Sequence, residues 1–185
     1  MVSWKGFQQW LRLRKQEQMM TSFAIGMNSS VDITEDKHIV MLDFDLKDQE
    51  RVEQAVIEAQ QFWAMSDCFL FKTTHGFHAI FFHEIVPYSR LRMIIEYTRD
   101  VDNLYRYISR FYSHKTLRVA GKYKERDIKF VKIIPGVREP TKQEWELGEM
   151  KRAEHRSMIG DAYVLSKFPE VSSKPDNKKK HNANN

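Results

Sequence analysis

Hydrophobic and polar residues recur along the chain with two periods, which together predict an α+β domain. Over residues 38–46 an unbroken apolar run passes into strict alternation, with Asp43 and Asp45 at the polar positions. That pattern predicts a strand. Over residues 49–66 the apolar side chains recur on one face at helical spacing, which predicts a helix after the strand.

The remaining periodic segments predict alternating pairs of strands and helices. Helices are expected over 4–20, 90–99, 103–112 and 141–158, and strands over 22–27, 68–72, 77–82, 115–119 and 127–134. The strands 68–72 and 77–82 flank a short polar turn and should form a hairpin, and the last two strands are expected to pair with each other. Thr141 and Glu144 form a capping box, so the last helix is expected to begin there, as an exposed helix. Hairpins rather than βαβ repeats indicate mixed or antiparallel sheets flanked by helices.

Length and composition indicate one domain. With 185 residues, 42% of them apolar, the chain can build one hydrophobic core, and a disordered, collagenous or disulfide-dense class is excluded. We expect a single domain over 1–170, with its core at about 20–134, a helical extension at about 141–158 and a disordered basic tail over 171–185. The single cysteine, Cys68, excludes an intrachain disulfide and a cysteine-based zinc site.

Apolar runs are too short for a membrane span, and the N-terminal residues are too polar for a signal peptide. We therefore expect a soluble intracellular protein that does not contact membranes. The formal charge is +5, from 30 Lys and Arg against 25 Asp and Glu. Residues 174–185 contribute four lysines and one aspartate, a net +3, which leaves about +2 for the rest. Charge alone favours a polyanionic partner only weakly.

The first candidate for chemistry is the pair Asp43 and Asp45. Side chains at i and i+2 of a strand project from the same face, about 6–7 Å apart. Two carboxylates at the end of a buried strand repel each other unless a cation lies between them, and Mg²⁺ and Mn²⁺ prefer such oxygen ligands. The alternative is that alternation simply places both on a solvated face of the sheet.

The second candidate is the turn that leads into the apolar strand at 77–82. Gly76 permits close approach of the backbone, and Thr74, His75 and His78 could converge on a phosphate. Small polar residues are also what a hairpin turn requires, so these side chains could be purely structural. His75 and His78 as metal ligands are a further alternative, but their i, i+3 spacing suits a helix better than a turn.

The third candidate combines an acid and two bases. Asp102 precedes the helix predicted from residue 103, and its role as an N-cap would by itself explain it. Arg118 lies on the strand that follows and Lys122 on the basic turn after it. These cations could contact a triphosphate or a nucleic-acid backbone, or could be ordinary surface charges.

The order of these features resembles the catalytic core of the archaeo-eukaryotic primase superfamily, the primase-polymerases. Its first motif, an apolar strand ending in DxD, is matched by VMLDFD at 40–45, and its second, a small residue and a histidine heading an apolar strand, by GFHAIFF at 76–82. Its third, an apolar residue followed by Asp, is matched by Val101–Asp102. Arg118 and Lys122 resemble the basic strand that follows in smaller members. The resemblance covers about residues 20–134.

Two positions depart from the family pattern. Gly76 stands where the family often has Ser, with hydroxyls nearby at Thr73 and Thr74. The third acid has two rivals, Asp100 and Asp127, which we rank behind Asp102.

The resemblance implies an RRM-like catalytic core and template-directed nucleotidyl transfer. Asp43, Asp45 and Asp102 would hold two Mg²⁺ or Mn²⁺ ions, with no zinc and no organic cofactor. His78 would contact the triphosphate, helped by His75, Thr74, Arg118 and Lys122.

The partners implied are a single-stranded DNA template, nucleoside triphosphates and a separate helicase or other replication proteins, because no phosphate-loop sequence GxxxxGK[ST] occurs in the chain. A plasmid or a virus is a candidate source.

Two other functions remain open at this point. A rolling-circle replication initiator would use paired histidines and a nucleophilic tyrosine, for which Tyr105, Tyr107 and Tyr112 are available. That function leaves Asp43 and Asp45 unexplained. A non-catalytic RRM-like module would instead stack bases on strand aromatics such as those at 71, 77 and 81. Strand aromatics are more often core residues, so we expect most of these rings to be packed inside.

Overall fold

Five antiparallel strands form the central sheet, in the order β2-β3-β5-β4-β7. The computed structural model describes residues 26–32, 34–118 and 128–159. The strands of this sheet are β2 (Ser30–Asp32), β3 (Lys37–Phe44), β4 (Cys68–Lys72), β5 (Phe77–Val86) and β7 (Lys129–Ile134). The two central strands, β3 and β5, have long apolar runs because both of their faces are covered.

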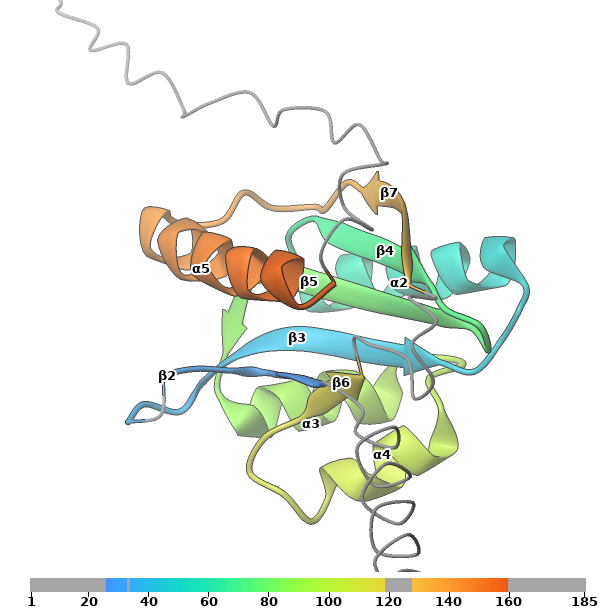
Figure 1. Ribbon diagram of the computed structural model, residues 1–185, viewed down its shortest axis with the longest axis horizontal. Helices are drawn as coiled ribbons and strands as arrows, with labels where there is room; N and C mark the ends of the chain where they lie inside the picture. The colour runs from blue at the N-terminus through green and yellow to red at the C-terminus, as the bar shows by residue number, and fades with distance from the viewer. Residues whose placement is uncertain (1–25, 33, 119–127, 160–185) are drawn as a thin grey trace, which may run out of the picture.

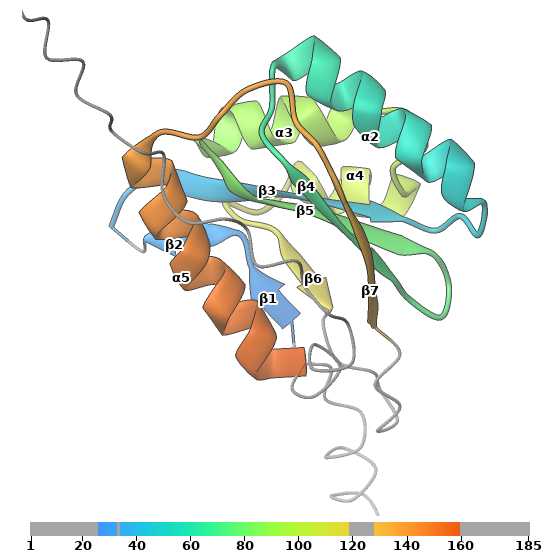
Figure 2. The same ribbon diagram turned by 90° about the horizontal axis from the view of Figure 1, so that it is seen from above.

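The helices lie on both faces of this sheet (Figure 1). The described residues form α2 (Gln49–Trp63), α3 (Tyr88–Tyr97), α4 (Asn103–Ser109) and α5 (Lys142–Ile159). Seen from above, α2 and α3 lie on one side of the sheet and α5 on the other (Figure 2). A two-stranded sheet, β1 (Gly26–Asn28) with β6 (Thr116–Arg118), lies on the α5 side. The expected α+β class with antiparallel sheets is confirmed.

The hydrophobic core lies between α2, α3 and the sheet and continues on the opposite face under α5. Four consecutive residues of β3, from Ile39 to Leu42, are fully buried, as are Val52 and Val56 of α2. The hairpin expected at 68–72 and 77–82 is confirmed as β4 and β5, and β5 continues to Val86.

Helix α5 differs from its prediction. The capping box exists, since Thr141 N donates to Glu144 Oε2 over 2.7 Å. The expectation of an exposed helix is wrong, because one face of α5 is buried against β5. Gly148 permits this packing: a Cβ atom there would lie 2.5 Å from the carbonyl oxygen of Phe82. The sequence concealed the contact because Lys151, Arg152 and His155 lie on the buried side.

The last two predicted strands do not pair with each other. β6 pairs with β1, and β7 pairs with the outer edge of β4, both antiparallel. β4 is strongly apolar, and without β7 its outer edge would be left unpaired. This pairing corrects the prediction that they form a hairpin.

Several predicted boundaries shift by a few residues. β3 ends at Phe44 rather than at 46, α3 begins at Tyr88 rather than at 90, and α4 ends at Ser109 rather than at 112. The predicted helix at 4–20 and the predicted tail at 171–185 lie outside the described residues.

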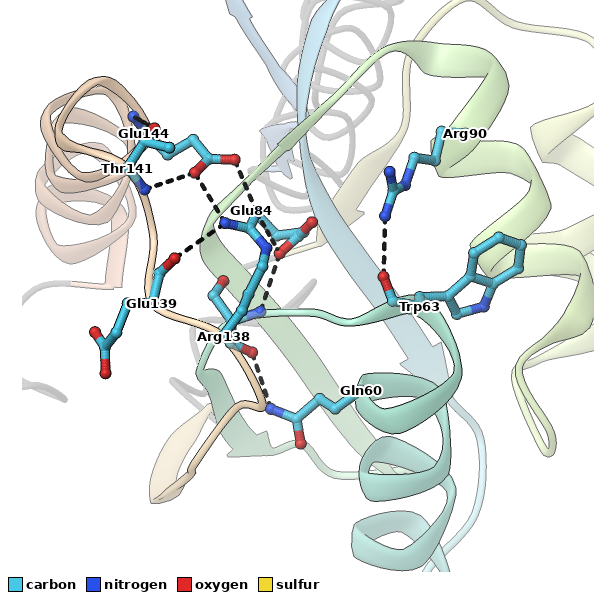
Figure 3. A network of polar contacts seen from close by, with 9 residues as sticks. Gln60, Trp63, Glu84, Arg90, Arg138, Glu139, Thr141 and Glu144 are labelled. Atoms are coloured by element: carbon cyan, nitrogen blue, oxygen red, sulfur yellow. Dashed lines mark hydrogen bonds and ion pairs between the residues drawn. The ribbon is translucent and has the colours of Figure 1, made fainter.

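A network of charged groups ties the chain before α5 to the sheet (Figure 3). The carboxylate of Glu84 is buried on β5 and accepts hydrogen bonds from Ser66 N at 3.0 Å and Arg138 Nη2 at 2.9 Å. Arg138 also donates to both carboxylate oxygens of Glu144. Arg138 forms an ion pair with Glu144, the capping-box residue, and this pair raises the pKa of Arg138. The network fixes the start of α5.

Candidate functional site

The end of β3 brings Asp43 opposite a buried histidine. Asp43 and His78 are register partners on β3 and β5, and Asp43 Oδ1 lies 3.5 Å from His78 Nε2. The side chain of Asp43 is 36% exposed, whereas that of His78 is 9% exposed. The first two predicted motifs are therefore adjacent in space, on the face of the sheet that α5 partly covers.

The third predicted acid joins this pair. Asp102 N donates a hydrogen bond to the carbonyl oxygen of Asp43 over 2.8 Å. Its carboxylate accepts from Tyr105 N at 2.6 Å, which makes it the N-cap of α4. The structural explanation and the functional one therefore apply to the same residue. Asp45 lies just beyond the end of β3 and is exposed.

Electrostatics show that these acids act on one another. The pKa of Asp43 is raised to about 6, first by burial and then by the charges of Asp102 and Asp45. Arg118 and Lys115 act in the opposite direction. Three carboxylates, Asp43, Asp45 and Asp102, are thus close enough to repel, and two cations already offset part of that repulsion. We call these three residues the acidic cluster.

His78 is held neutral beside the cluster. Burial, followed by the charge of Arg118, lowers its pKa to about 4. Its Nδ1 atom is buried and makes no hydrogen bond with any described residue. A neutral ring with an unsatisfied nitrogen at the edge of an acidic cluster is suited to binding a polar ligand.

Lys115 was missed by sequence reasoning. It lies just before β6 and is 3% exposed. Its Nζ donates to the carbonyl oxygen of Tyr105 over 2.9 Å and lies 3.9 Å from the centre of the Tyr105 ring. Burial lowers its pKa to about 8, although Asp43 and Asp102 raise it. The alternation noted in the sequence, Arg118 between Leu117 and Val119, did not single out Lys115 as an inward lysine.

Ser29 fixes the backbone of Lys115. Ser29 N donates to the carbonyl oxygen of Lys115 at 2.7 Å, and Lys115 N donates to Ser29 Oγ at 2.9 Å. The same hydroxyl lies 3.0 Å from Nδ1 of the buried His38. One buried serine therefore links the small sheet to β3 and fixes the position from which Lys115 reaches the site.

His155 of α5 is the second residue that the sequence did not reveal. It is fully buried, and its ring packs edge-on against Phe71 and Phe82. Burial and the proximity of His78 lower its pKa to about 3. It therefore brings α5 close to His78 from the opposite side to Asp43.

The other predicted basic and polar residues are divided. Arg118 is exposed at the end of β6, near enough to lower the pKa of both Asp43 and His78. Thr74 and His75 are exposed in the β4–β5 turn. Lys122 lies outside the described residues.

Gly76 brings that turn against the end of β3. A Cβ atom at Gly76 would lie 2.9 Å from Leu46 N and closer still to the carbonyl oxygen of Phe44. No larger residue fits without displacing the segment that carries Asp45. The small residue at this position of the motif therefore has a steric reason.

Asp100, one of the two rivals for the third acid, is held in an ion pair of its own. Asp100 accepts two hydrogen bonds from Arg51, at 2.9 and 2.5 Å, and also faces Arg99 at 3.3 Å. The Arg51 hydrogen bond lowers the pKa of Asp100, which marks a satisfied ion pair. Asp127 lies outside the described residues.

Carboxylate oxygens such as those of the acidic cluster are the ligands that hard divalent cations prefer, although the described side chains are not arranged around one common point. Within residues 26–32, 34–118 and 128–159, no group of three or more His, Cys, Asp or Glu side chains is arranged to hold a metal ion. Burial, and then the charges of Asp102 and Asp45, raise the pKa of Asp43, and an oxygen-bound cation would neutralise the charge of these carboxylates. Asp43, Asp45 and Asp102 are the residues that would hold it.

Side-chain positions bear on both alternative functions. Of the three tyrosines available to an initiator, Tyr105 is buried with its hydroxyl donating to the carbonyl oxygen of Met41 and is not placed to act as a nucleophile, whereas Tyr107 and Tyr112 are exposed. Phe71, Phe77 and Phe81 are at most 1% exposed and cannot stack on bases. The expectation that these strand rings are mostly core residues is confirmed.

Comparison with known proteins adds no relative: no family model, curated protein or solved structure matches this chain. No helix among the described residues is long and apolar enough to cross a membrane.

Proposed function

We propose that the protein is a template-directed nucleotidyltransferase, a DNA primase or primase-polymerase, that acts on nucleoside triphosphates with Mg²⁺ or Mn²⁺. The observation that carries the proposal is the meeting of three residues from separate segments: Asp43 Oδ1 lies 3.5 Å from His78 Nε2, and Asp102 N donates to the carbonyl oxygen of Asp43 over 2.8 Å. Burial, and then the charges of Asp102 and Asp45, raise the pKa of Asp43, and the buried Nδ1 of His78 makes no hydrogen bond with any described residue. Carboxylates from two separate chain segments, a buried histidine and two cations are a set that suits a metal-bound triphosphate.

Each residue has a distinct task in this proposal. Asp43, Asp45 and Asp102 would hold the cations. Bound cations would activate the attacking 3′-hydroxyl and neutralise charge on the triphosphate. His78, neutral above about pH 5, donates or accepts a hydrogen bond without adding a charge. Arg118 and Lys115 attract the phosphates, and catalysis consists mainly of positioning and charge neutralisation.

The arrangement of the elements supports the same proposal. The succession β3, α2, β4, β5, α3, with β5 between β3 and β4 in the sheet, is the order expected of an RRM-like core. Asp43 and His78 lie on the sheet face opposite α2 and α3, where such a core leaves room for a ligand. A separate helicase, an intracellular location and a plasmid or viral source belong to the proposal as well.

The test is incorporation of labelled nucleotides on a primed single-stranded template with Mn²⁺ or Mg²⁺. We expect the wild type to extend the primer and Asp43→Asn to lose at least about 100-fold in rate, since a metal ligand is removed. The control is Asp48→Asn, because Asp48 is an exposed N-cap of α2 and Asn also caps helices. Full activity in Asp43→Asn would overturn the proposal. So would a wild-type protein that incorporates neither ribonucleotides nor deoxyribonucleotides with Mg²⁺ or with Mn²⁺.

A further inference from the structure

Helix α4 exposes an unusual number of large apolar side chains. Leu104, Tyr107, Ile108 and Phe111 follow the i, i+3, i+4, i+7 spacing of one helical stripe and its continuation, yet they face solvent. Tyr107, Phe111 and Tyr112 are 57%, 65% and 59% exposed. The rings of Tyr107 and Phe111 touch, with centroids 4.9 Å apart. We call these three residues the aromatic patch.

The chain segment that carries this patch is rich in basic residues. Residues 103–118 contain four Lys or Arg and neither Asp nor Glu. Continued to residue 126, the segment has seven Lys or Arg against one Glu, a net +6, which exceeds the +5 of the whole chain. Arg110 directly precedes Phe111 and pairs with Glu96 at 2.5 Å, and Arg118 is exposed at the end of β6. The charge favours a polyanion over an apolar protein surface.

The opposite side of α4 is attached to the acidic cluster. Asp102 caps the helix, and Tyr105 donates its hydroxyl hydrogen to Met41 and accepts from Lys115 at its carbonyl oxygen. Because Tyr105 points inward, the neighbouring Tyr107 and the more distant Phe111 point outward. A ligand on the aromatic patch would therefore lie next to the helix that carries the third carboxylate, and Arg118 would lead it toward Asp43.

We propose that single-stranded DNA binds across α4, with unpaired bases stacked on Tyr107, Phe111 and Tyr112 and phosphates near Arg110 and Arg118. Exposed rings interleaved with basic residues bind single strands because every base has a face on which to stack, whereas bases in a duplex are already stacked. This inference rests on the proposed function, which requires a template near the acidic cluster. It adds where that template lies and which residues hold it.

The experiment measures binding of a fluorescein-labelled 20-nucleotide single-stranded DNA by fluorescence anisotropy, with the full chain and EDTA present. Without metal or nucleotide, the result does not depend on the acidic cluster. We expect Tyr107→Ala/Phe111→Ala/Tyr112→Ala to weaken binding about tenfold or more, since each stacked base contributes substantially. The variant Tyr107→Phe/Tyr112→Phe keeps the rings and should bind within about twofold of wild type.

Further variants separate stacking from general effects. Phe62→Ala removes an aromatic ring that is 77% exposed on α2, and it should leave DNA binding unchanged. Arg110→Met should reduce the dependence of log Kd on log salt by about 0.7, the contribution of one phosphate contact. Thermal unfolding of every variant checks that the fold is intact.

Three outcomes would overturn the inference. The triple alanine variant could bind like wild type, a duplex of the same sequence could bind as tightly as the single strand, or the patch could instead mediate self-association, seen as a wild-type dimer in analytical ultracentrifugation that the triple variant dissociates. Failure of the proposed function has a different signature, since Asp43→Asn would then keep its incorporation rate whether or not the aromatic patch binds DNA.

Discussion

The backbone N–H of Asp102 donates to the carbonyl oxygen of Asp43 over 2.8 Å, so the N-cap of α4 is attached to the next-to-last residue of β3. The hydrogen bond brings together two acids that are 59 positions apart, and the charge of Asp102 is the second largest cause of the raised pKa of Asp43. The closeness of these two groups leads to the predictions that follow.

Asp43→Asn is expected to stabilise the fold while it removes activity. The pKa of Asp43 is about 6 in the folded protein against 3.8 for an unperturbed aspartate, so wild-type stability falls as pH rises from about 4 to about 6. Asn carries no charge, so the free energy of unfolding of the variant should exceed that of wild type by about 1–2 kcal/mol above pH 6 and by nothing near pH 4. Solvent screening of the exposed third of the Asp43 side chain keeps this difference small. Urea unfolding at pH 4, 5, 6 and 7.5 measures the difference. A constant difference across this range would contradict the assigned charge repulsion.

The two acids that precede α4 should respond in opposite ways. Asp102→Asn keeps an N-cap and is expected to hold stability within about 1 kcal/mol while primer extension is lost. Asp100→Asn weakens an ion pair with Arg51 and should leave extension nearly unchanged. Both rates are measured with the same primed template. A loss in Asp100→Asn with retention in Asp102→Asn would exchange their roles.

Gly76→Ala should destabilise the protein and displace Asp45. The added methyl group would clash with the backbone at Phe44 and Leu46, and backbone atoms cannot move aside as a flexible side chain could. We expect a loss of about 2–4 kcal/mol in the free energy of unfolding. His75→Ala, in the same turn and exposed, is the control and should change it by less than about 0.5 kcal/mol. Equal effects of the two substitutions would refute the steric role of Gly76.

Arg138→Met should cost far more stability than loss of a surface arginine. It leaves the buried carboxylate of Glu84 without its charged partner, for which we expect about 3–5 kcal/mol in chemical denaturation. Adding Glu84→Gln removes the stranded charge and should recover part of that loss. Arg110→Met, which breaks the exposed pair with Glu96, should cost less than about 1 kcal/mol. If the double variant is no more stable than Arg138→Met, the buried charge is not the cause.

Local patterns in the sequence predicted much of the fold. The strand around Asp43 follows from strict alternation, and the hairpin before Phe77 follows from a small polar turn, so both depend on neighbouring residues only. Both lie close to where they were predicted. The pairing of β7 with β4 and of β6 with β1 depends on which sheet edges remain uncovered, and the residues in the strands do not encode that directly.

The candidate site was predictable in part, for the same reason. Asp43, Asp102 and His78 stood out by their positions at the ends of elements. Lys115 and His155 are polar residues whose burial depends on long-range packing, by Ser29 in one case and by Phe71 and Phe82 in the other. The choice between Asp102 and Asp100 required the partner of each, since both directly precede the same helix.

The packing of α5 makes access to Asp43 directional. Gly148 holds the helix against Phe82 and His83, and His155 continues the contact toward Phe71, so the described part of α5 shields one half of this sheet face. Asp43 lies at the other end, where β3 finishes and α4 and β6 stand (Figure 1). Among the described residues, a bulky substrate that approaches Asp43 from the side away from α5 would first meet residues on α4 and β6.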